Sequence, residues 1–136
     1  LGKMAFGCTI MAAFTLLDGA ASLVFGAQAK IPLLWVIMDN FGESFGYLWV
    51  VPVAIAFYTH TAPKPVNAMM VGVYYLSIFA GSLISGRLGS LYEALSPTAF
   101  WTLHAGIVAS AGVIFAGLAF SGVAGRFAPR HIVAAV

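Results

Sequence analysis

Polar residues divide the chain into four long apolar segments. The segments run over residues 4–28, 31–58, 67–88 and 98–123. Each is longer than the roughly 20 apolar residues with which a helix crosses a bilayer. They lack the alternation of apolar and polar positions that is typical of strands in a membrane barrel. We therefore predict an all-α, polytopic membrane protein in which residues 1–136 form a single membrane domain of four transmembrane helices.

The amino-acid composition agrees with a lipid environment. Hydrophobic residues make up 62% of the chain and charged residues 7%, and the mean hydropathy is +1.01. Soluble domains average about 45–50% apolar and about 25% charged residues. The chain has too few charges to cover the surface of a water-soluble domain, and disorder requires low hydrophobicity. The expected partner of its surface is therefore membrane lipid.

Two features bear on the shape of individual helices. Ser96 followed by Pro97 predicts the start of the fourth helix, since Ser is a favoured N-cap and Pro suits the first helical position. Pro52 predicts a kink in the second helix, because proline lacks an amide donor and clashes with the preceding turn. Kinked helices occur at the substrate sites of transporters, but proline is also frequent in membrane helices generally. Both interpretations of Pro52 stay open.

Basic residues indicate the orientation of the chain. Four of them flank the membrane face that also holds both termini: Lys3, Lys64, Arg126 and Arg130. Two flank the other face: Lys30 and Arg87. Because cytoplasmic loops carry an excess of Lys and Arg, we predict a multi-pass protein of the cell membrane (inner or plasma membrane) with both termini in the cytoplasm.

Small residues recur every four positions along the third segment, at Ser77, Gly81, Ser85 and Gly89. This spacing places them on one face of a helix. Small residues let the backbones of membrane helices approach closely. We expect Gly81, Ser85 and Gly89 to pack against a neighbouring helix, and a substrate-lining role is the alternative for Ser77.

Asp39, Glu43 and Tyr47 share one face of the second segment in the same way. Two carboxylates one helical turn apart repel each other when both are ionised, so the pair suits a proton carrier or a site for a cationic group. Acidic residues at membrane depth are costly and usually functional. We expect a functional role for Glu43, which lies deeper, whereas Asp39 is expected to reach the lipid headgroups.

Two further polar residues lie inside the segments. Asp18 has no basic residue within a helical turn and is expected to pair with another helix or to hold a proton. His104 lies one turn into the fourth segment and is expected to satisfy a local polar contact. The candidates for proton coupling are therefore Glu43, Asp39 and Asp18.

Other kinds of site find no support in the sequence. Cys8 is the lone cysteine, which excludes an intrachain disulfide and two-cysteine redox or metal motifs. No His/Cys/carboxylate cluster has metal-ligand spacing, and no nucleophile–base motif, glycine-rich phosphate loop or basic run is present. We predict that the chain is not an enzyme, uses no metal or cofactor and has no nucleic-acid partner.

Part of the chain resembles a known transporter family. The matching runs are Pro52-Val53 through Ala62-Pro63, Met69 through Ser77, and Phe79-Ala80-Gly81-Ser82-Leu83 to Gly86. They resemble the C-terminal part of the proton-dependent oligopeptide transporters (POT/PTR), a branch of the major facilitator superfamily. The resemblance covers nearly the whole chain, but in the first and fourth segments it is limited to hydropathy. It implies that the segments are the last four helices of that fold, and that the chain is a fragment of a longer transporter.

The resemblance implies proton-coupled symport of di- or tripeptides, or of related small solutes, by alternating access. The partners are then the small-molecule or peptide substrate, protons and the remaining helices of the same transporter. The family's helices that match the second and third segments line the central cavity, and those that match the first and fourth are peripheral. By this analogy a functional role is more strongly expected for Glu43 and Tyr47 and less strongly expected for Asp18 and His104.

The resemblance also points to individual binding residues. Tyr47 stands where the family has a Glu that is associated with binding the amino terminus of the peptide. Glu43, one turn earlier on the same face, is the candidate to replace that Glu. Tyr74 stands where the family often has Trp. The candidate substrate-binding residues are therefore Glu43, Tyr47, Tyr74 and Ser77.

Two other functions stay open. The first is a complete small four-helix protein that acts as an oligomer, a multidrug-type proton antiporter in which Asp18 carries the proton. The second is a structural or scaffold subunit in which Asp18 and Glu43 are buried and paired. Proton-driven uptake by the full-length protein would discriminate against the scaffold.

Overall fold

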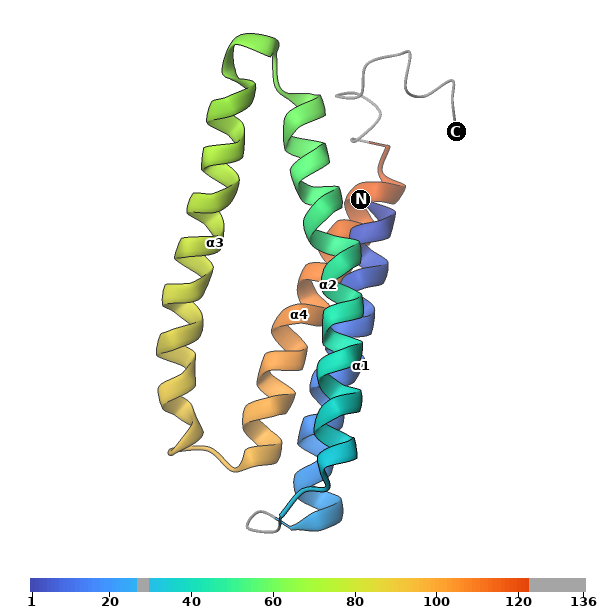
Figure 1. Cartoon of the computed structure of the whole chain (residues 1–136), viewed down its shortest axis with the longest axis vertical. Helices are drawn as coiled ribbons and strands as arrows, with labels where there is room; N and C mark the ends of the chain where they lie inside the picture. Colours follow the sequence, from blue (N-terminus) through green and yellow to red (C-terminus); the bar gives the residue numbers. More distant parts are fainter. Residues whose placement is uncertain (27–29, 123–136) are drawn as a thin grey trace.

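Residues 1–26 and 30–122, which the computed structural model describes, fold into four long helices (Figure 1). The helices are α1 (Gly2–Phe25), α2 (Leu33–Thr61), α3 (Asn67–Gly89) and α4 (Pro97–Phe120). Short 3₁₀ turns, η1 (Lys64–Val66) and η2 (Ser90–Tyr92), precede and follow α3. No strand occurs within these ranges, which confirms the all-α prediction. Each helix, with its two turns added to α3, is long and apolar enough to cross a membrane.

The helix ends lie close to the predicted ones. The largest extension is in α2, which continues to Thr61 although its apolar segment ends at Tyr58. The hydroxyl groups of Thr59 and Thr61 donate to the carbonyl oxygens of Ile55 (3.0 Å) and Phe57 (2.6 Å). These bonds satisfy the polar side chains inside the helix, so polarity does not end it. The expected end of the fourth helix, residue 123, lies outside the described residues.

The start of α4 follows the sequence prediction. Ser96 is the N-cap, and its side-chain oxygen accepts a hydrogen bond of 3.3 Å from the backbone amide of Ala99. Pro97 occupies the first helical position. Proline is tolerated there because an amide hydrogen at that position makes no hydrogen bond within the helix. In α2, by contrast, Pro52 lies within an unbroken helix.

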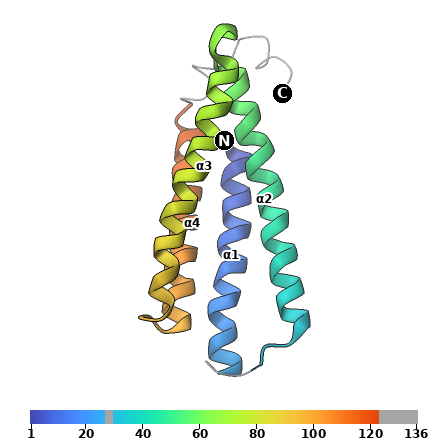
Figure 2. The same ribbon diagram turned by 60° about the vertical axis from the view of Figure 1, so that its left-hand side comes forward.

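The four helices do not form an even bundle. α1 packs along both α4 and α2, and it lies between them in Figure 2. α3 stands apart in Figure 1, and its main helical neighbour is α2. Among the residues of α3 only Tyr74 is buried. Hereafter the Lys64 end is the end of the bundle at the turn between α2 and α3, and the Lys30 end is the opposite one.

Glycines set the closest approach of α1 and α2. A Cβ atom added to Gly7 would lie 2.7 Å from the backbone oxygen of Gly46, and one added to Gly46 would lie 2.9 Å from the backbone oxygen of Gly7. Gly42, one turn before Gly46, lies under the ring of Phe14. The missing side chains of Gly7 and Gly46 let the two backbones meet, as small residues do in membrane bundles.

The part of the small-residue stripe that runs from Gly81 to Gly89 in α3 has no close neighbour in the described chain. Gly81, Ser85 and Gly89 are exposed. No atom from elsewhere in the described chain would lie within 4 Å of a Cβ added to Gly81 or Gly89. The described residues therefore do not supply the neighbour expected for this stripe, and its packing role stays a prediction.

A polar contact joins the first and last helices near the Lys30 end. The side-chain oxygens of Ser22 in α1 and Thr98 in α4 lie 2.6 Å apart, so one hydroxyl donates to the other. Further along the same interface, a Cβ added to Gly112 would lie 3.1 Å from the Cβ atom of Cys8. Close backbones and this hydrogen bond hold α1 against α4 without charged groups.

Candidate functional site

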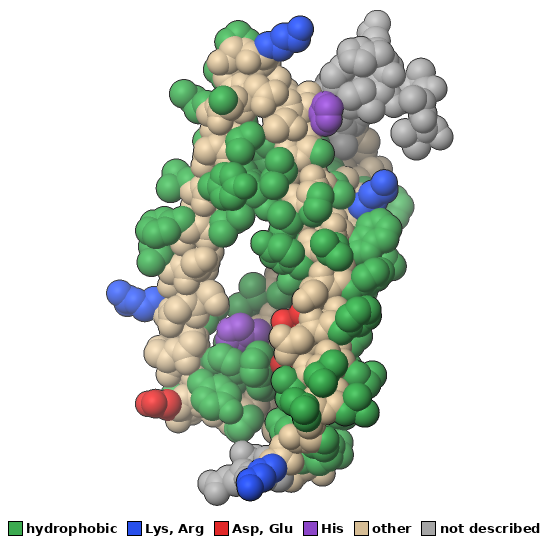
Figure 3. Space-filling view, viewed as in Figure 1, with side chains coloured by type: hydrophobic (Ala, Val, Ile, Leu, Met, Phe, Trp, Pro, Cys, Tyr) green, Lys and Arg blue, Asp and Glu red, His purple; other side chains and the backbone are tan. Residues whose placement is uncertain are grey.

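Three acidic side chains from two helices meet between α1 and α2. The carboxyl groups of Asp18 in α1 and Asp39 in α2 approach closely enough to share a hydrogen bond when one of them is protonated, and Glu43 lies near enough to repel both electrostatically. The charged neighbours of Asp39 are thus Asp18 and Glu43, with no basic group among them. Figure 3 shows acidic side chains in red within the bundle, beside hydrophobic side chains in green and other groups in tan. We call Asp18, Asp39 and Glu43 the acidic cluster.

Asp39 does not reach the lipid headgroups, so that expectation was wrong. Its side chain is 8% exposed, and its Oδ1 atom is buried without a hydrogen-bond partner in the described structure. Position along α2 alone suggested a headgroup contact. The rotation of α2 about its axis decides otherwise, because it turns Asp39 toward Asp18. Asp18 lies against the Asp39 side chain of α2, which is the first of the two environments expected for it, a partner on another helix.

Glu43 is held by a residue that the sequence did not single out. The Thr15 hydroxyl in α1 lies 3.0 Å from Glu43 Oε1 and 2.9 Å from the backbone oxygen of Met11. Thr15 is 5% exposed, so it is sealed in the interface with Glu43. One signal was available in the sequence: Thr15 precedes Asp18 by three residues, which places both on one face of α1.

Protons are the chemistry that this cluster can support. Two ionised carboxylates have only acceptor atoms, so a hydrogen bond between Asp18 and Asp39 requires that one of them carries a proton. Among residues 1–26 and 30–122, no three His, Cys, Asp or Glu side chains are grouped so that they could hold a metal ion. The arrangement of the cluster is compatible with a proton shared between carboxyl groups of two helices.

An apolar cavity of about 540 Å³ lies at the Lys64 end, among residues of all four helices. Tyr47, Tyr74 and Ser77, which the sequence proposed as substrate-binding residues, all contribute to its wall. The ring of Tyr58 packs on that of Tyr74 with 5.8 Å between their centroids. Most of the other lining residues are aliphatic or aromatic. The cavity therefore suits an apolar group of a small solute, with tyrosine and serine hydroxyls as its polar contacts.

A smaller cavity connects this region with the acidic cluster. It measures about 380 Å³ and is lined by Met11, Glu43, Ser44, Tyr47 and Leu48. Tyr47 lines both cavities. The four predicted substrate-binding residues thus surround two adjoining cavities, and Tyr47 stands at the boundary between the carboxyl group of Glu43 and the apolar space.

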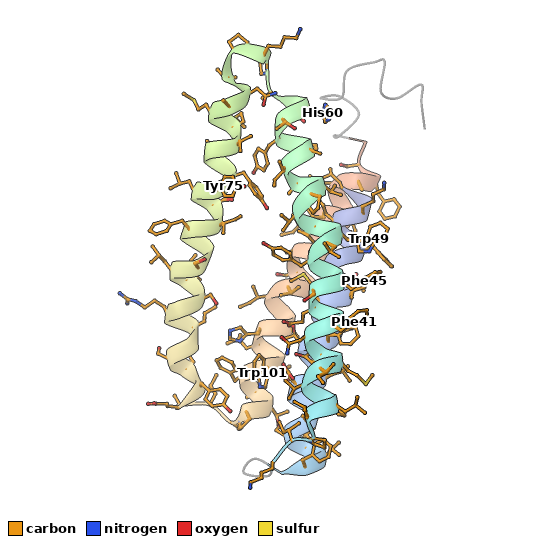
Figure 4. The ribbon with its side chains drawn as sticks, viewed as in Figure 1. Phe41, Phe45, Trp49, His60, Tyr75 and Trp101 are labelled. Atoms are coloured by element: carbon orange, nitrogen blue, oxygen red, sulfur yellow. The ribbon has the colours of Figure 1, made fainter. Side chains whose placement is uncertain are left out.

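The outer face of α2 is aromatic and belongs to neither cavity. Figure 4 shows Phe41, Phe45 and Trp49 on the side of α2 that points away from α3. Phe41 is 73% exposed, and Phe45 packs edge-on to Trp49 with 6.4 Å between ring centroids. This face suits contact with lipid or with further apolar helices, and it leaves the opposite side of α2 to the candidate site.

His104 and Pro52 lie outside the site. His104 Nδ1 lies 2.9 Å from the backbone oxygen of Phe100, and the two rings stack with centroids 4.2 Å apart. This is the local contact expected for His104. Pro52 is exposed on α2, next to Val51, which lines the larger cavity.

In comparisons with known proteins, no protein-family model, no curated protein and no solved structure matches the chain. The resemblance to oligopeptide transporters therefore rests on the residues quoted from the sequence alone.

Proposed function

We propose that the chain is the C-terminal four-helix portion of a proton-coupled transporter of the cell membrane, with both termini in the cytoplasm. One observation carries the proposal: three of the four acidic residues in the chain gather at one interface between two apolar helices. The acidic cluster carries the proton, and the two cavities next to Tyr47 bind the solute. The solute class that the resemblance implies is a di- or tripeptide or a related small molecule.

The energetics of the cluster support a cycle driven by protonation. A charged side chain at the centre of a membrane helix costs at least about 2.5 kcal/mol, even on the scale that gives the lowest values. Like charges at close range add repulsion, so the fully ionised cluster pushes α1 and α2 apart. The protonated cluster draws them together through the Asp18–Asp39 bond. Proton uptake and release thus favour two different arrangements of the helices, which is what alternating access requires.

The position of Tyr47 supports coupling between proton and solute. Glu43 and Tyr47 lie one helical turn apart on α2 and line the same small cavity. A cationic group of the solute in that cavity would interact more strongly with ionised Glu43 than with neutral Glu43. By linkage, the solute would then alter the proton occupancy of Glu43, and the proton would alter solute binding.

A second candidate function is favoured by the position of Asp18. The family resemblance makes the first helix peripheral, yet α1 packs on both α2 and α4 and brings Asp18 into the acidic cluster. This arrangement also suits a complete four-helix proton antiporter that works as an oligomer. Sequencing the open reading frame upstream of Leu1 separates the two candidates. Eight or so further predicted spans, each about 20 apolar residues long, would favour the long symporter.

The test uses the full-length protein, reconstituted in liposomes with an imposed pH gradient. Glu43→Gln should reduce proton-driven uptake of a labelled dipeptide by more than tenfold, because a neutral amide carries no exchangeable acidic proton. Solute counterflow, which needs no net proton movement, should persist. Glu93→Gln is the matched control, since Glu93 is an exposed residue between η2 and α4. Equal driven uptake by Glu43→Gln and the wild type would refute the role of Glu43.

A further inference from the structure

Thr15 has two acceptors for one proton. Its Oγ1 atom lies 2.9 Å from the backbone oxygen of Met11 and 3.0 Å from Glu43 Oε1. A hydroxyl group has a single hydrogen to donate and lone pairs with which to accept. Thr15 therefore cannot donate fully to both oxygens at once. Which oxygen accepts the Thr15 hydrogen bond depends on whether the Glu43 carboxyl group is protonated.

The charge on Glu43 selects between two arrangements. When Glu43 is neutral, its carboxyl O–H donates to Thr15 Oγ1, and the Thr15 hydroxyl donates to Met11. When Glu43 is ionised, the Thr15 hydroxyl donates to the carboxylate, because a hydrogen bond to an ionised acceptor is roughly twice as strong as a neutral one. The charged groups that face Glu43 are Asp18 from α1 and Asp39 from α2, and neither supplies a competing donor when ionised.

The switch also changes α1 itself. A threonine that donates to the backbone oxygen four residues earlier tends to bend its helix, and this bond is present only in the neutral arrangement. Met11 lies directly against Gly46, near the closest approach of α1 and α2. A change in bend at Met11 is therefore transmitted to the interface that Gly7 and Gly46 form.

From this geometry we infer that Thr15 is a positioning residue, whose hydroxyl changes its acceptor with the protonation of Glu43 and thereby alters the bend of α1. The inference rests on the proposed role of Glu43 as a proton carrier. The only covalent change is the gain or loss of the Glu43 proton. Thr15 itself neither gains nor loses a net proton.

Three variants of the full-length protein test this role. Thr15→Val removes the hydroxyl at nearly constant shape, and Thr15→Ser retains it. Thr9→Val is the matched control, because the Thr9 hydroxyl donates to the backbone oxygen of Ala5 (3.0 Å) on an exposed face of α1. We expect Thr15→Val to lower proton-driven uptake about tenfold, the scale of a lost hydrogen bond to a charged group. Thr15→Ser and Thr9→Val should remain close to the wild type.

Infrared spectroscopy provides a readout that a merely structural role would not move. The carboxyl stretching band of Glu43 is identified by its loss in Glu43→Gln. It should shift to higher frequency in Thr15→Val, where the carboxyl group has lost its hydroxyl partner, and stay in place in Thr15→Ser. Wild-type uptake together with an unmoved band in Thr15→Val would overturn the switch.

A further measurement needs no variant at Thr15. In the wild type labelled with ¹³C-carbonyl methionine, the labelled amide band should change when Glu43 titrates, and it should not change in Glu43→Gln. A band that is the same at every pH would overturn the inference even if Thr15→Val failed to fold. The two proposals fail separately: if Glu43→Gln loses driven uptake but Thr15→Val does not, only the role of Thr15 falls. If Glu43→Gln retains driven uptake, the proposed function falls first.

Discussion

At the Lys30 end, α1 and α2 enclose hydrogen-bonded carboxyl groups, whereas at the Lys64 end residues of all four helices surround an apolar cavity of about 540 Å³. The first region is closely packed, with the ring of Phe14 lying on Gly42, and the second is hollow and lined by aromatic rings. Polar groups with hydrogen bonds demand fixed neighbours, since an unpaired one in lipid is costly. Apolar walls tolerate rearrangement. The α1–α2 interface is thus the fixed part of the contrast, and α3, with one buried residue, has the most room to move.

The largest expected effect concerns the close approach of α1 and α2 between the two regions, next to Val50 of the cavity wall. Gly7→Leu would force a side chain against the backbone oxygen of Gly46, where even a Cβ atom would lie at 2.7 Å. Overpacking costs about 1–3 kcal/mol and more when only backbone can yield, so we expect a loss of about 3 kcal/mol in unfolding free energy. Denaturant unfolding in lipid bicelles would measure it. Gly86→Leu, where nothing lies within 4 Å, is the control. Equal losses at both glycines would remove the contrast in packing.

The apolar region should respond less in stability and more in solute affinity. Tyr74 is 7% exposed and is the one buried residue of α3. Tyr74→Ala should cost about 2 kcal/mol, below the usual range for buried aromatics because α3 has room to relax. It should also raise the KM for the solute several-fold while proton coupling persists. Tyr75→Ala, at a residue that is 57% exposed, is the control. An unchanged KM in Tyr74→Ala would exclude the cavity as the solute site.

The hydrogen bond within the acidic cluster should appear as a coupling between two substitutions. Asp18→Asn and Asp39→Asn each leave one carboxyl group and one amide donor, so each single variant retains a hydrogen bond without a shared proton. The double variant loses both carboxyl groups. We expect a coupling free energy of about 1–2 kcal/mol in a double-mutant cycle of unfolding. Additive effects would mean that Asp18 and Asp39 do not interact.

The smallest expected effect lies outside both regions. Ser96→Ala removes the side-chain acceptor for the amide of Ala99, and N-cap losses of this kind cost about 1 kcal/mol. Ser121→Ala, at the other end of α4, removes no N-cap and should cost less. If Ser96→Ala also impaired solute uptake, the start of α4 would belong to the functional machinery rather than to the scaffold.

The sequence predicted the helices well because helix length and end signals are local. Four apolar segments and the cap at Ser96 required no knowledge of tertiary contacts. The environment of Asp39 was mispredicted because the rotation of an apolar helix about its axis is barely encoded in its own hydropathy. Thr15 was missed for a related reason, since one threonine in an apolar helix carries no signal until its partner on another helix is known.

Small residues show the same limit. The regular stripe at Gly81, Ser85 and Gly89 was the most visible pattern, yet no other described helix comes within 4 Å of a Cβ added to Gly81 or Gly89. The contacts between α1 and α2 use Gly7 and Gly46, whose meeting depends on the pairing of two helices. A repeat within one helix shows that close packing is permitted, but it does not identify the partner.

The interface between α1 and α4 has a consequence for how the protein is made. It is the most extensive contact between elements of the described chain, and it joins the first of the four described helices to the fourth. During synthesis α1 and α2 can pair early, but one side of α1 stays uncovered until α4 has been synthesised. Ser22 lacks its partner Thr98 throughout that interval. The contact between α1 and α4 therefore forms only after α4 has been synthesised, and a chain interrupted before α4 would leave that side of α1 uncovered.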